Sequence, residues 1–422
     1  MTAMTAYARL GNRLASAVLA LAAGAVVSAS SVVAETLADR IATAETGATI
    51  RLPAGQYSGP ITIDKSLTIL GGDSVTITGT GEGSVITIAA PDVTIKGLHI
   101  RGSGTSLKDM DAGVFINKKG AGARVEGNRI EGNLFGVYLW GSKNARVADN
   151  DIIGSQYHRM NERGNGVSVW NAPGSVIDGN RIRYGRDGIF VTTSKNNRFI
   201  NNDFRNLRIA VHYMYANNSE VSGNRSYGNH VGYALMYSRN LTVKGNLSED
   251  DHNHGILLNF TNQAVIRDNK VLNGRDKCVF IYNSNKSTFY RNHFEGCRIG
   301  VHFTAGSERN LIHGNAFIGN RTQIKYVGSR HLNWSHEGRG NYWSDHPSFD
   351  MNNDGIADAL YRPNDLVDQV VWAHPRAKLL LNSPALQIVR FAQAQLPALH
   401  PGGVVDTAPL MVPLTVHLGK GK

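Results

Sequence analysis

Three residues from two neighbouring segments of the chain carry side chains that bind soft metal ions. His212 and Met214 alternate within Ala210–Met214, and Met236 ends the comparable segment Gly232–Met236. Thioether sulfur and imidazole nitrogen together suit Cu(I), which is a soft ion. An apolar surface covered by a loop or a partner is the alternative interpretation. The pattern predicts a copper site if the fold brings the two segments side by side.

A second candidate metal site is the polar run Asp250–His254. Its two histidines, His252 and His254, are separated by one residue, so on an extended segment they would face the same way. Two imidazoles with a carboxylate can bind copper or zinc. A solvated polar turn is the alternative interpretation. The sequence contains no zinc-protease, P-loop or dinucleotide-binding motif.

A third candidate resembles the start of a calcium-binding loop. Asp350, Asn352, Asp354 and Asp358 occupy its positions 1, 3, 5 and 9, and Gly355 occupies position 6. The glutamate expected at position 12 is absent, and the flanking helices of an EF-hand are not evident. A calcium site and an Asp/Asn-rich turn that needs no ion are both open here.

The elements that must position these residues repeat at a nearly constant interval. Each repeat is marked by an asparagine, and from Asn180 onward the steps are 22, 22, 22, 23, 23 and 23 residues. A step of 30 residues before Asn180 places an insertion near 156–164. A fixed period of this length indicates a solenoid. The markers are Asn128, Asn150, Asn180, Asn202, Asn224, Asn246, Asn269, Asn292 and Asn315.

A short strand follows each marker, and its second and fourth residues are apolar in every coil. This alternation is typical of a strand with one buried face. In Ala210–Met214 the outward positions then hold His212 and Met214. We expect an all-β, right-handed parallel β-helix of about 22–23 residues per coil, with stacked asparagines at one bend. Met236 would lie one strand from Met214, roughly 5 Å along the axis.

Composition divides the chain into three parts. Residues 1–34 combine two arginines with an apolar run and are typical of a secretory signal peptide. We therefore expect an exported protein, and a retained membrane anchor is the alternative interpretation of this segment. Residues 35–340 are predicted to form the β-helix, and 341–422 a C-terminal capping or docking region. Its helical patterns either pack back on the solenoid or dock to a membrane protein.

The net charge of +11 is spread along the chain without a block of five or more basic residues. This argues against a nucleic-acid partner and favours anionic lipid or an acidic protein. Two cysteines, Cys278 and Cys297, are too few for a disulfide scaffold. One disulfide bridge, two buried thiols and metal thiolates all remain open for them.

The outward strand positions carry aromatic, small, Met and His residues but no acidic pair of the kind that polysaccharide-cleaving β-helices use. Four aspartates are expected in turns, namely Asp187, Asp203, Asp250 and Asp268. The sequence therefore favours a protein that is not an enzyme. The alternatives are a polysaccharide-binding or -modifying enzyme, such as a lyase or epimerase, and a metal-free scaffold.

Several motifs in nearly the whole mature chain resemble the NosD family, periplasmic proteins that mature the copper sites of nitrous oxide reductase. These motifs are Val211–Tyr215, Gly232–Met236, Thr304–Glu308, Gly338–Asp345, Arg362–Asp368 and Gly403–Asp406. The resemblance implies work with an ABC transporter formed by NosF and NosY. It also implies a copper chaperone, NosL, and the reductase itself, NosZ. The implied role is to receive copper and help deliver it; the ligand residues named above are not implied by the resemblance.

Overall fold

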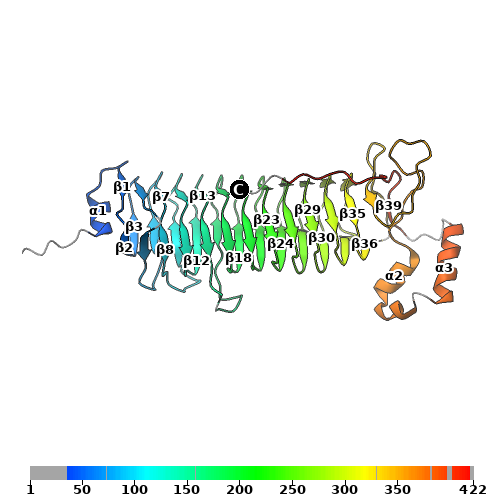
Figure 1. The fold of residues 1–422 in the computed structure, drawn as a ribbon, viewed down its shortest axis with the longest axis horizontal. Coiled ribbons are helices and arrows are strands. Elements are labelled where there is room, and N and C mark those ends of the chain that lie inside the picture. The colour runs from blue at the N-terminus through cyan, green and yellow to red at the C-terminus, as the bar shows by residue number, and fades with distance from the viewer. Residues whose placement is uncertain are drawn as a thin grey trace, which may run out of the picture. The chain divides into compact units, whose positions relative to one another are not determined.

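The computed structural model describes residues 36–72, 74–156, 158–328, 330–380, 383–396 and 402–418. The predicted signal peptide, residues 1–34, lies outside the described residues. Within the described part, the chain forms a parallel β-helix, as expected from the repeat (Figure 1). Its three parallel sheets contain 12, 13 and 12 strands, and we name them sheets A, B and C.

The strands of each sheet come from successive coils, so every third strand in the chain is a neighbour. Sheet A consists of β1 (Thr49–Arg51), β4 (Thr68–Leu70), β7 (Thr94–Lys96), β10 (Arg124–Glu126), β13 (Arg146–Ala148), β16 (Val176–Asp178), β19 (Arg198–Ile200), β22 (Glu220–Ser222), β25 (Thr242–Lys244), β28 (Val265–Arg267), β31 (Thr288–Tyr290) and β34 (Leu311–His313). Sheet B consists of β2 (Gly55–Ser58), β5 (Val75–Thr78), β8 (His99–Arg101), β11 (Arg129–Glu131), β14 (Asp151–Ile153), β17 (Arg181–Arg183), β20 (Asp203–Arg205), β23 (Arg225–Tyr227), β26 (Leu247–Glu249), β29 (Lys270–Leu272), β32 (His293–Glu295), β35 (Ala316–Ile318) and β38 (Tyr342–Trp343). Sheet C consists of β3 (Ile61–Ile63), β6 (Ile86–Ile88), β9 (Ala112–Ile116), β12 (Phe135–Trp140), β15 (Val167–Trp170), β18 (Asp187–Thr192), β21 (Ile209–Met214), β24 (Val231–Met236), β27 (His254–Asn259), β30 (Lys277–Tyr282), β33 (Ile299–Thr304) and β36 (Thr322–Val327).

The core is a set of apolar columns along the solenoid axis. In sheet A the central residue of each three-residue strand from β4 to β34 is buried. Val147, Ile177 and Phe199 form part of one such column, because the strands pair in register. Strand alternation places one side chain in the core and its neighbours outside. The outward columns of sheet C are therefore the surface on which the candidate ligands lie.

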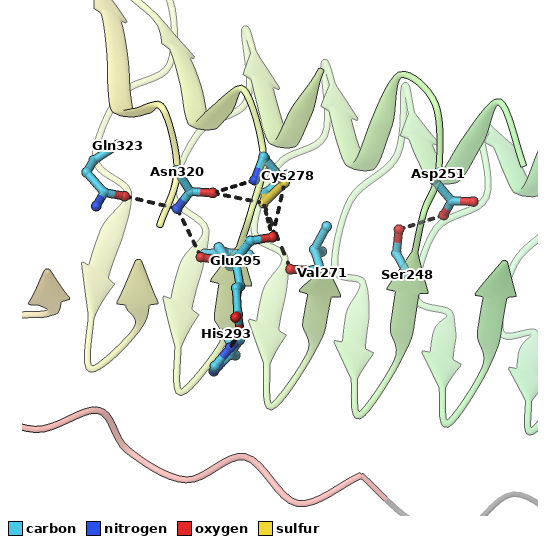
Figure 2. The surroundings of a disulfide bond; sticks show 10 residues. Ser248, Asp251, Val271, Cys278, His293, Glu295, Asn320 and Gln323 are labelled. Atoms are coloured by element: carbon cyan, nitrogen blue, oxygen red, sulfur yellow. Dashed lines mark hydrogen bonds and ion pairs between the residues drawn. A yellow bond between two sulfur atoms is a disulfide. The ribbon is translucent and has the colours of Figure 1, made fainter. Parts of the chain in front are cut away.

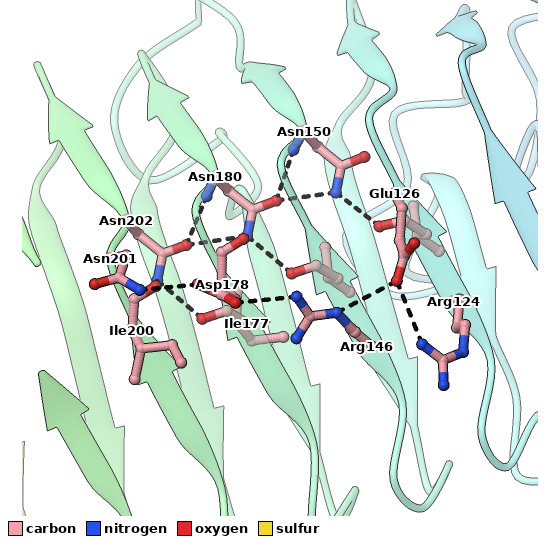
Figure 3. A network of polar contacts seen from close by, with 12 residues as sticks. Arg124, Glu126, Arg146, Asn150, Ile177, Asp178, Asn180, Ile200, Asn201 and Asn202 are labelled. Atoms are coloured by element: carbon pink, nitrogen blue, oxygen red, sulfur yellow. Dashed lines mark hydrogen bonds and ion pairs between the residues drawn. The ribbon is translucent and has the colours of Figure 1, made fainter. Parts of the chain in front are cut away.

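An asparagine ladder runs through the bend between sheets A and B (Figure 3). Asn180 donates both its backbone N–H and its side-chain amide to Oδ1 of Asn202, each at 3.0 Å. The Asn202 amide in turn donates to the buried carbonyl of Ile177 at 3.0 Å. The same bonds recur from Asn128 through Asn315, and Asn341 adds one further rung that the sequence did not predict. We call this row, including Asn341, the asparagine ladder.

Both ends of the described solenoid are covered. At one end, α1 (Leu37–Thr43) begins at a capping box formed by Thr36 and Asp39, and buries Leu37 and Ile41. At the other end the last rung, Asn341, donates its N–H to the buried carboxylate of Asp406 at 2.6 Å. The indole of Trp343 donates to the same carboxylate oxygen at 2.8 Å.

The C-terminal region carries short elements beyond the sheets. β37 (His331–Asn333) pairs in parallel with β39 (Gly403–Val405). Between them lie α2 (Leu366–Ala373), the 3-10 helix η1 (Pro375–Leu380) and α3 (Pro384–Gln395). Asp365 and Ser383 cap the two α-helices through bonds to backbone N–H groups. The helical patterns predicted for this region are therefore observed.

Cys278 and Cys297 form a disulfide inside the solenoid, with their Cα atoms 5.7 Å apart (Figure 2). Both side chains are buried. The structure thus selects the bridge from the three alternatives that the sequence left open. Asn320, one coil further on, accepts a hydrogen bond from the Cys297 N–H at 2.9 Å.

A second row of buried hydrogen-bond acceptors lies at the bend between sheets B and C. Asn229 and Asn320 belong to it, and Asp251 occupies the equivalent place in the coil that follows Asn229. Asp251 accepts from the Asn229 N–H at 2.7 Å and from the hydroxyls of Ser226 and Ser248 at 2.7 and 2.6 Å. Burial raises the pKa of Asp251 to about 6, against the lowering effect of these bonds. Asp251 therefore places a carboxylate at a position where the side-chain oxygen of an asparagine could accept the same backbone hydrogen bond.

Replacing Asn224 with alanine tests the asparagine ladder. The substitution removes an acceptor of two bonds from Asn202 and a donor of two bonds, to Asn246 and to the Phe199 carbonyl. Because these groups are buried, we expect the free energy of unfolding to fall by about 2–4 kcal/mol, measured by denaturant titration. Asn240→Gly is the matched control, because Asn240 is exposed, has a φ of 55° and makes one ladder-like bond, to Asn218. Equal losses in both variants would contradict the ladder's role.

Replacing Asp251 with asparagine tests the carboxylate at the second bend. The folded-state pKa of about 6 exceeds the unfolded value of about 3.9, so the folded state binds more protons between these pH values. The contribution of Asp251 to stability therefore falls as the pH rises from about 4 to about 6. We expect Asp251→Asn to be more stable than the wild type at pH 7.5, on the order of 1–3 kcal/mol.

Thermal unfolding of both proteins between pH 4 and 8 measures this difference. The advantage of the variant should shrink towards pH 4. Asp64→Asn is the control, since Asp64 is exposed. A difference that does not change with pH would contradict the assignment.

Candidate functional site

The outer face of sheet C brings the first group of predicted ligands together. His212 and Met214 lie on β21, and Met236 ends the neighbouring strand β24. The register pairs Met214 directly with Met236, and His212 with Ala234. Neighbouring strands are about 4.8 Å apart, and all three side chains are half-buried. Two thioethers and one imidazole thus share one patch of surface.

Asp187 and Arg208 stand behind His212 and fix its ring. Oδ2 of Asp187 lies 2.9 Å from His212 Nδ1 and 2.6 Å from Arg208 Nη2. Burial by itself would raise the pKa of Asp187, but the hydrogen bonds from His212 and Arg208 outweigh it and hold the pKa below its usual range. An ionised carboxylate favours the proton on Nδ1, which leaves the lone pair on Nε2 for a metal ion. This is the arrangement that outer carboxylates give to metal-binding histidines.

The contact of Asp187 with His212 was not predicted, and the expected place of Asp187 in a turn was wrong. Asp187 and Asp203, expected in turns, begin strands β18 and β20. The side chain of Asp187 is only 1% exposed, so it is not an outward acid either. The strand register would have predicted the contact with His212. It pairs Asp187 with Ile209 on the next strand, and His212 is three residues after Ile209.

Aromatic rings border the patch. The ring of Phe190, on the strand before His212, lies 5.0 Å from the imidazole between centroids. Further along, Trp140 and Trp170 stack at 5.5 Å. On the other side, Tyr215 and Tyr237 follow Met214 and Met236 directly in the chain and stack at 5.2 Å. The thioethers therefore sit in a largely apolar part of the surface.

The second predicted group, His252 and His254, is arranged differently. His252 is exposed in the bend, whereas His254 begins β27 and is half-buried. Burial, and then the nearby charge of Lys277, lowers the pKa of His254 to about 4, so its ring is neutral at pH 7. Asp251, directly before His252, points inward to Ser226 and Ser248 and is not available as a carboxylate ligand (Figure 2 shows Asp251 with Ser248).

The third predicted group forms a loop closed by its own hydrogen bonds. Asp350 accepts from the N–H groups of Asp354 and Gly355, at 3.2 and 2.8 Å. Asn352 also accepts from the Asp354 N–H, and Asp358 accepts from the Met351 N–H. The four predicted side chains thus gather around one turn. These bonds are also those of an Asp/Asn-rich turn without an ion.

In the described ranges, no group of three or more His, Cys, Asp or Glu side chains has a geometry that could hold a metal ion. The patch of His212, Met214 and Met236 is of another kind, since two of its three ligands are thioethers. Across the same part of the chain, every helix is too short or too polar to cross a membrane.

Comparisons with known proteins place the chain in a family. A family described as "Periplasmic copper-binding protein (NosD)" matches residues 149–348. A protein of Stutzerimonas stutzeri named "Probable ABC transporter binding protein NosD" is 41% identical over 375 residues, which are 86% of each chain. A protein of the same name from Pseudomonas aeruginosa is 39% identical over 373 residues, 85% of this chain and 87% of that one.

Solved structures share the fold at much lower identity. An alginate lyase of family PL6, in complex with a trisaccharide, has a TM-score of 0.49 and 13% identity, over 70% of this chain and 85% of that one. The periplasmic alginate epimerase AlgG has a TM-score of 0.46 and 13% identity, over 69% of this chain and 83% of that one. The relatives similar over most of the chain, by contrast, are named as binding proteins. With its ladder-built β-helix and relatives at about 40% identity along most of its length, the chain belongs to the NosD family of periplasmic copper-binding proteins.

Proposed function

We propose that this protein accepts Cu(I) from a NosL-type chaperone and helps deliver it to nitrous oxide reductase. It does so while docked on an ABC transporter of the NosF–NosY type, at the periplasmic face of the inner membrane. The observation that carries the proposal is the direct pairing of Met214 with Met236 beside His212. The family description as copper-binding and the relatives' name as transporter binding proteins support it.

The ligand types and the accessibility of the patch suit a protein that carries copper. Cu(I) prefers thioether and imidazole ligands over carboxylates, and the half-buried positions leave one side open to a partner. A protein that must release its ion needs a site that can be reached by the next ligand. The hydrogen bond from His212 to Asp187 orients the imidazole before the ion arrives.

The C-terminal helices are the proposed contact with the transporter. Ile388 and Phe391 lie on the outer face of α3 and are 67% and 68% exposed, while Leu379 in η1 is 90% exposed. Large apolar side chains exposed to this degree are typical of a protein or membrane contact. Leu386 and Val389, on the other face of α3, are half-buried, so the helix can keep its packing while it docks.

Calcium in the loop of Asp350, Asn352, Asp354 and Asp358 is a separate proposal that rests on residue order alone. The copper proposal does not depend on it. A melting temperature that rises with added calcium, and no longer rises after Asp350→Asn, would support it. Equal melting temperatures with and without calcium would favour the turn that needs no ion.

Two rival functions make different predictions. A polysaccharide-modifying enzyme would release unsaturated ends from alginate or pectin, or change the stereochemistry of their sugars. We expect neither, because the outward carboxylate pair that such chemistry uses is absent from the patch and Asp187 is buried. A metal-free scaffold would bind the transporter and the reductase but take up no Cu(I).

Replacing the three ligands together tests the copper site. We expect the variant His212→Ala, Met214→Leu, Met236→Leu to lose the Cu(I) bound by the wild-type protein, because both sulfurs and the free imidazole nitrogen are gone. The leucines keep the apolar volume, so the fold should persist. Anaerobic Cu(I) titration against a chromogenic chelator measures the stoichiometry, and circular dichroism checks the fold.

Two further variants sharpen this test. Asp187→Asn should weaken Cu(I) binding by about 10–100-fold without abolishing it, since the carboxylate orients the ligand from behind. Met351→Leu is the control, because Met351 is 84% exposed and lies outside the patch. An unchanged copper stoichiometry in the triple variant would remove the proposed site.

Substitutions on α3 test the transporter contact. We expect Ile388→Gln with Phe391→Gln to weaken binding to the transporter in nanodiscs at least tenfold, because the apolar anchors of the contact are lost. Leu360→Gln is the control, since Leu360 is 49% exposed but lies outside the helices. If the double variant binds the transporter with wild-type affinity, the helices serve only to cap the solenoid.

A further inference from the structure

Four aromatic side chains form a row on the surface beside the two thioethers. Tyr215, Tyr237 and Phe260 are stacked, and Tyr282 meets Phe260 edge to face at 76°. Tyr215, Tyr237 and Phe260 directly follow the last residues of β21, β24 and β27, and Tyr282 ends β30. Successive ring centroids lie 5.2, 5.3 and 5.8 Å apart. The four side chains are 54%, 38%, 42% and 42% exposed. We call this row the aromatic ladder.

The backbone at the aromatic ladder is in a conformation that bulky residues avoid. Tyr215, Tyr237 and Phe260 have φ values of 58°, 49° and 49°, in the left-handed region that glycine and asparagine adopt most easily. The comparable positions after β15 and β30 are occupied by Asn171 and Asn283. Three large rings at such positions carry a steric cost. Strain of this kind on an exposed surface points to function rather than to stability.

Unpaired positive charges accompany the aromatic ladder. Lys195, Arg239, Lys286 and Arg309 lie in the bend that follows sheet C and are all exposed. Among the described residues none of the four forms an ion pair. Glu308, which lines the same hollow as three of them, is paired with Arg330 at 2.9 Å. Arg239, Lys286 and Arg309 line a shallow hollow of about 560 Å³. The surface beside the rings is therefore complementary to a negatively charged partner.

The stacking favours a protein over a sugar polymer as that partner. The planes of Tyr215 and Tyr237 meet at 24°, and those of Tyr237 and Phe260 at 7°. Rings stacked on one another in this way turn their edges, not their faces, to the outside, whereas sugars pack on ring faces. Exposed tyrosine, phenylalanine, methionine and arginine are the side chains enriched in the cores of protein interfaces.

The aromatic ladder is continuous with the candidate copper patch. Tyr215 follows Met214 and Tyr237 follows Met236 in the chain, so a partner covering the rings would also cover the thioethers. We propose that the aromatic ladder and its basic border are the docking surface for an acidic protein that exchanges Cu(I) with Met214 and Met236. The identity of the cargo rests on the proposed function; the docking surface itself rests on the rings and charges.

Two surface variants test this proposal. The first, Tyr237→Asn with Phe260→Asn, removes two rings and places asparagine where neighbouring coils already carry it, so the backbone is tolerated. The second, Arg239→Glu with Lys286→Glu, reverses the charge of two residues in the basic border. Phe349→Asn and Arg181→Glu are the matched controls, because Phe349 is 55% exposed elsewhere and Arg181 is exposed on sheet B. The probes are the purified Cu(I)-loaded NosL-type chaperone, the copper-free reductase and alginate oligosaccharides.

Biolayer interferometry at low and high salt measures the binding. We expect both surface variants to bind at least one of the two proteins at least tenfold more weakly than the wild type. The charge variant should also lose most of the salt dependence. The controls should bind like the wild type. Variants that match the wild type, a wild-type chain that binds neither protein, or variants that lose only alginate binding would each overturn the proposal.

Cu(I) titration of the isolated variants separates the two proposals. Both surface variants should retain wild-type copper stoichiometry, because His212, Met214 and Met236 are intact. If the wild type takes up no Cu(I) yet the variants lose partner binding, the copper function fails and the docking surface stands. If copper binds normally and partner binding is unaffected, the docking surface fails alone.

Discussion

The asparagine ladder is the constraint on which the rest of this molecule depends. Each rung satisfies a backbone N–H, a side-chain amide and a buried carbonyl at a tight bend, so one residue type closes a turn that would otherwise bury unpaired polar groups. The rungs fix the register of the coils between Asn128 and Asn341. Because the register is constant, the outward columns of sheet C are aligned, and chemistry can be built across residues far apart in the chain.

The candidate copper patch is a direct result of that alignment. Met214 and Met236 are 22 residues apart but adjacent in sheet C, and His212 is oriented by Asp187 from the preceding coil. A flat solenoid wall offers such ligands to a partner rather than enclosing them. This geometry suits handing over an ion more than storing it.

Two of the motifs that make the chain resemble the NosD family hold the C-terminal end of the solenoid together. Asn341 and Trp343, from the motif Gly338–Asp345, both donate to Asp406 in the motif Gly403–Asp406. They end the asparagine ladder with a buried carboxylate in place of another asparagine. These two motifs thus close the solenoid, while α3, between them in the chain, exposes the apolar side chains of Ile388 and Phe391.

Local sequence determined much of this protein. The repeat period, the alternation within each strand, the marker asparagines and the helical patterns of the C-terminal region were all predictable, because each depends on residues close together in the chain and on simple burial. The pairing of Met214 with Met236 followed once the period was known. Asp187 beneath His212, the inward turn of Asp251, the disulfide and the stacked rings on left-handed backbone were decided by the tertiary structure alone. Each of these depends on the offset between coils and on side-chain direction at a bend, and neither quantity is encoded in any single stretch of the chain.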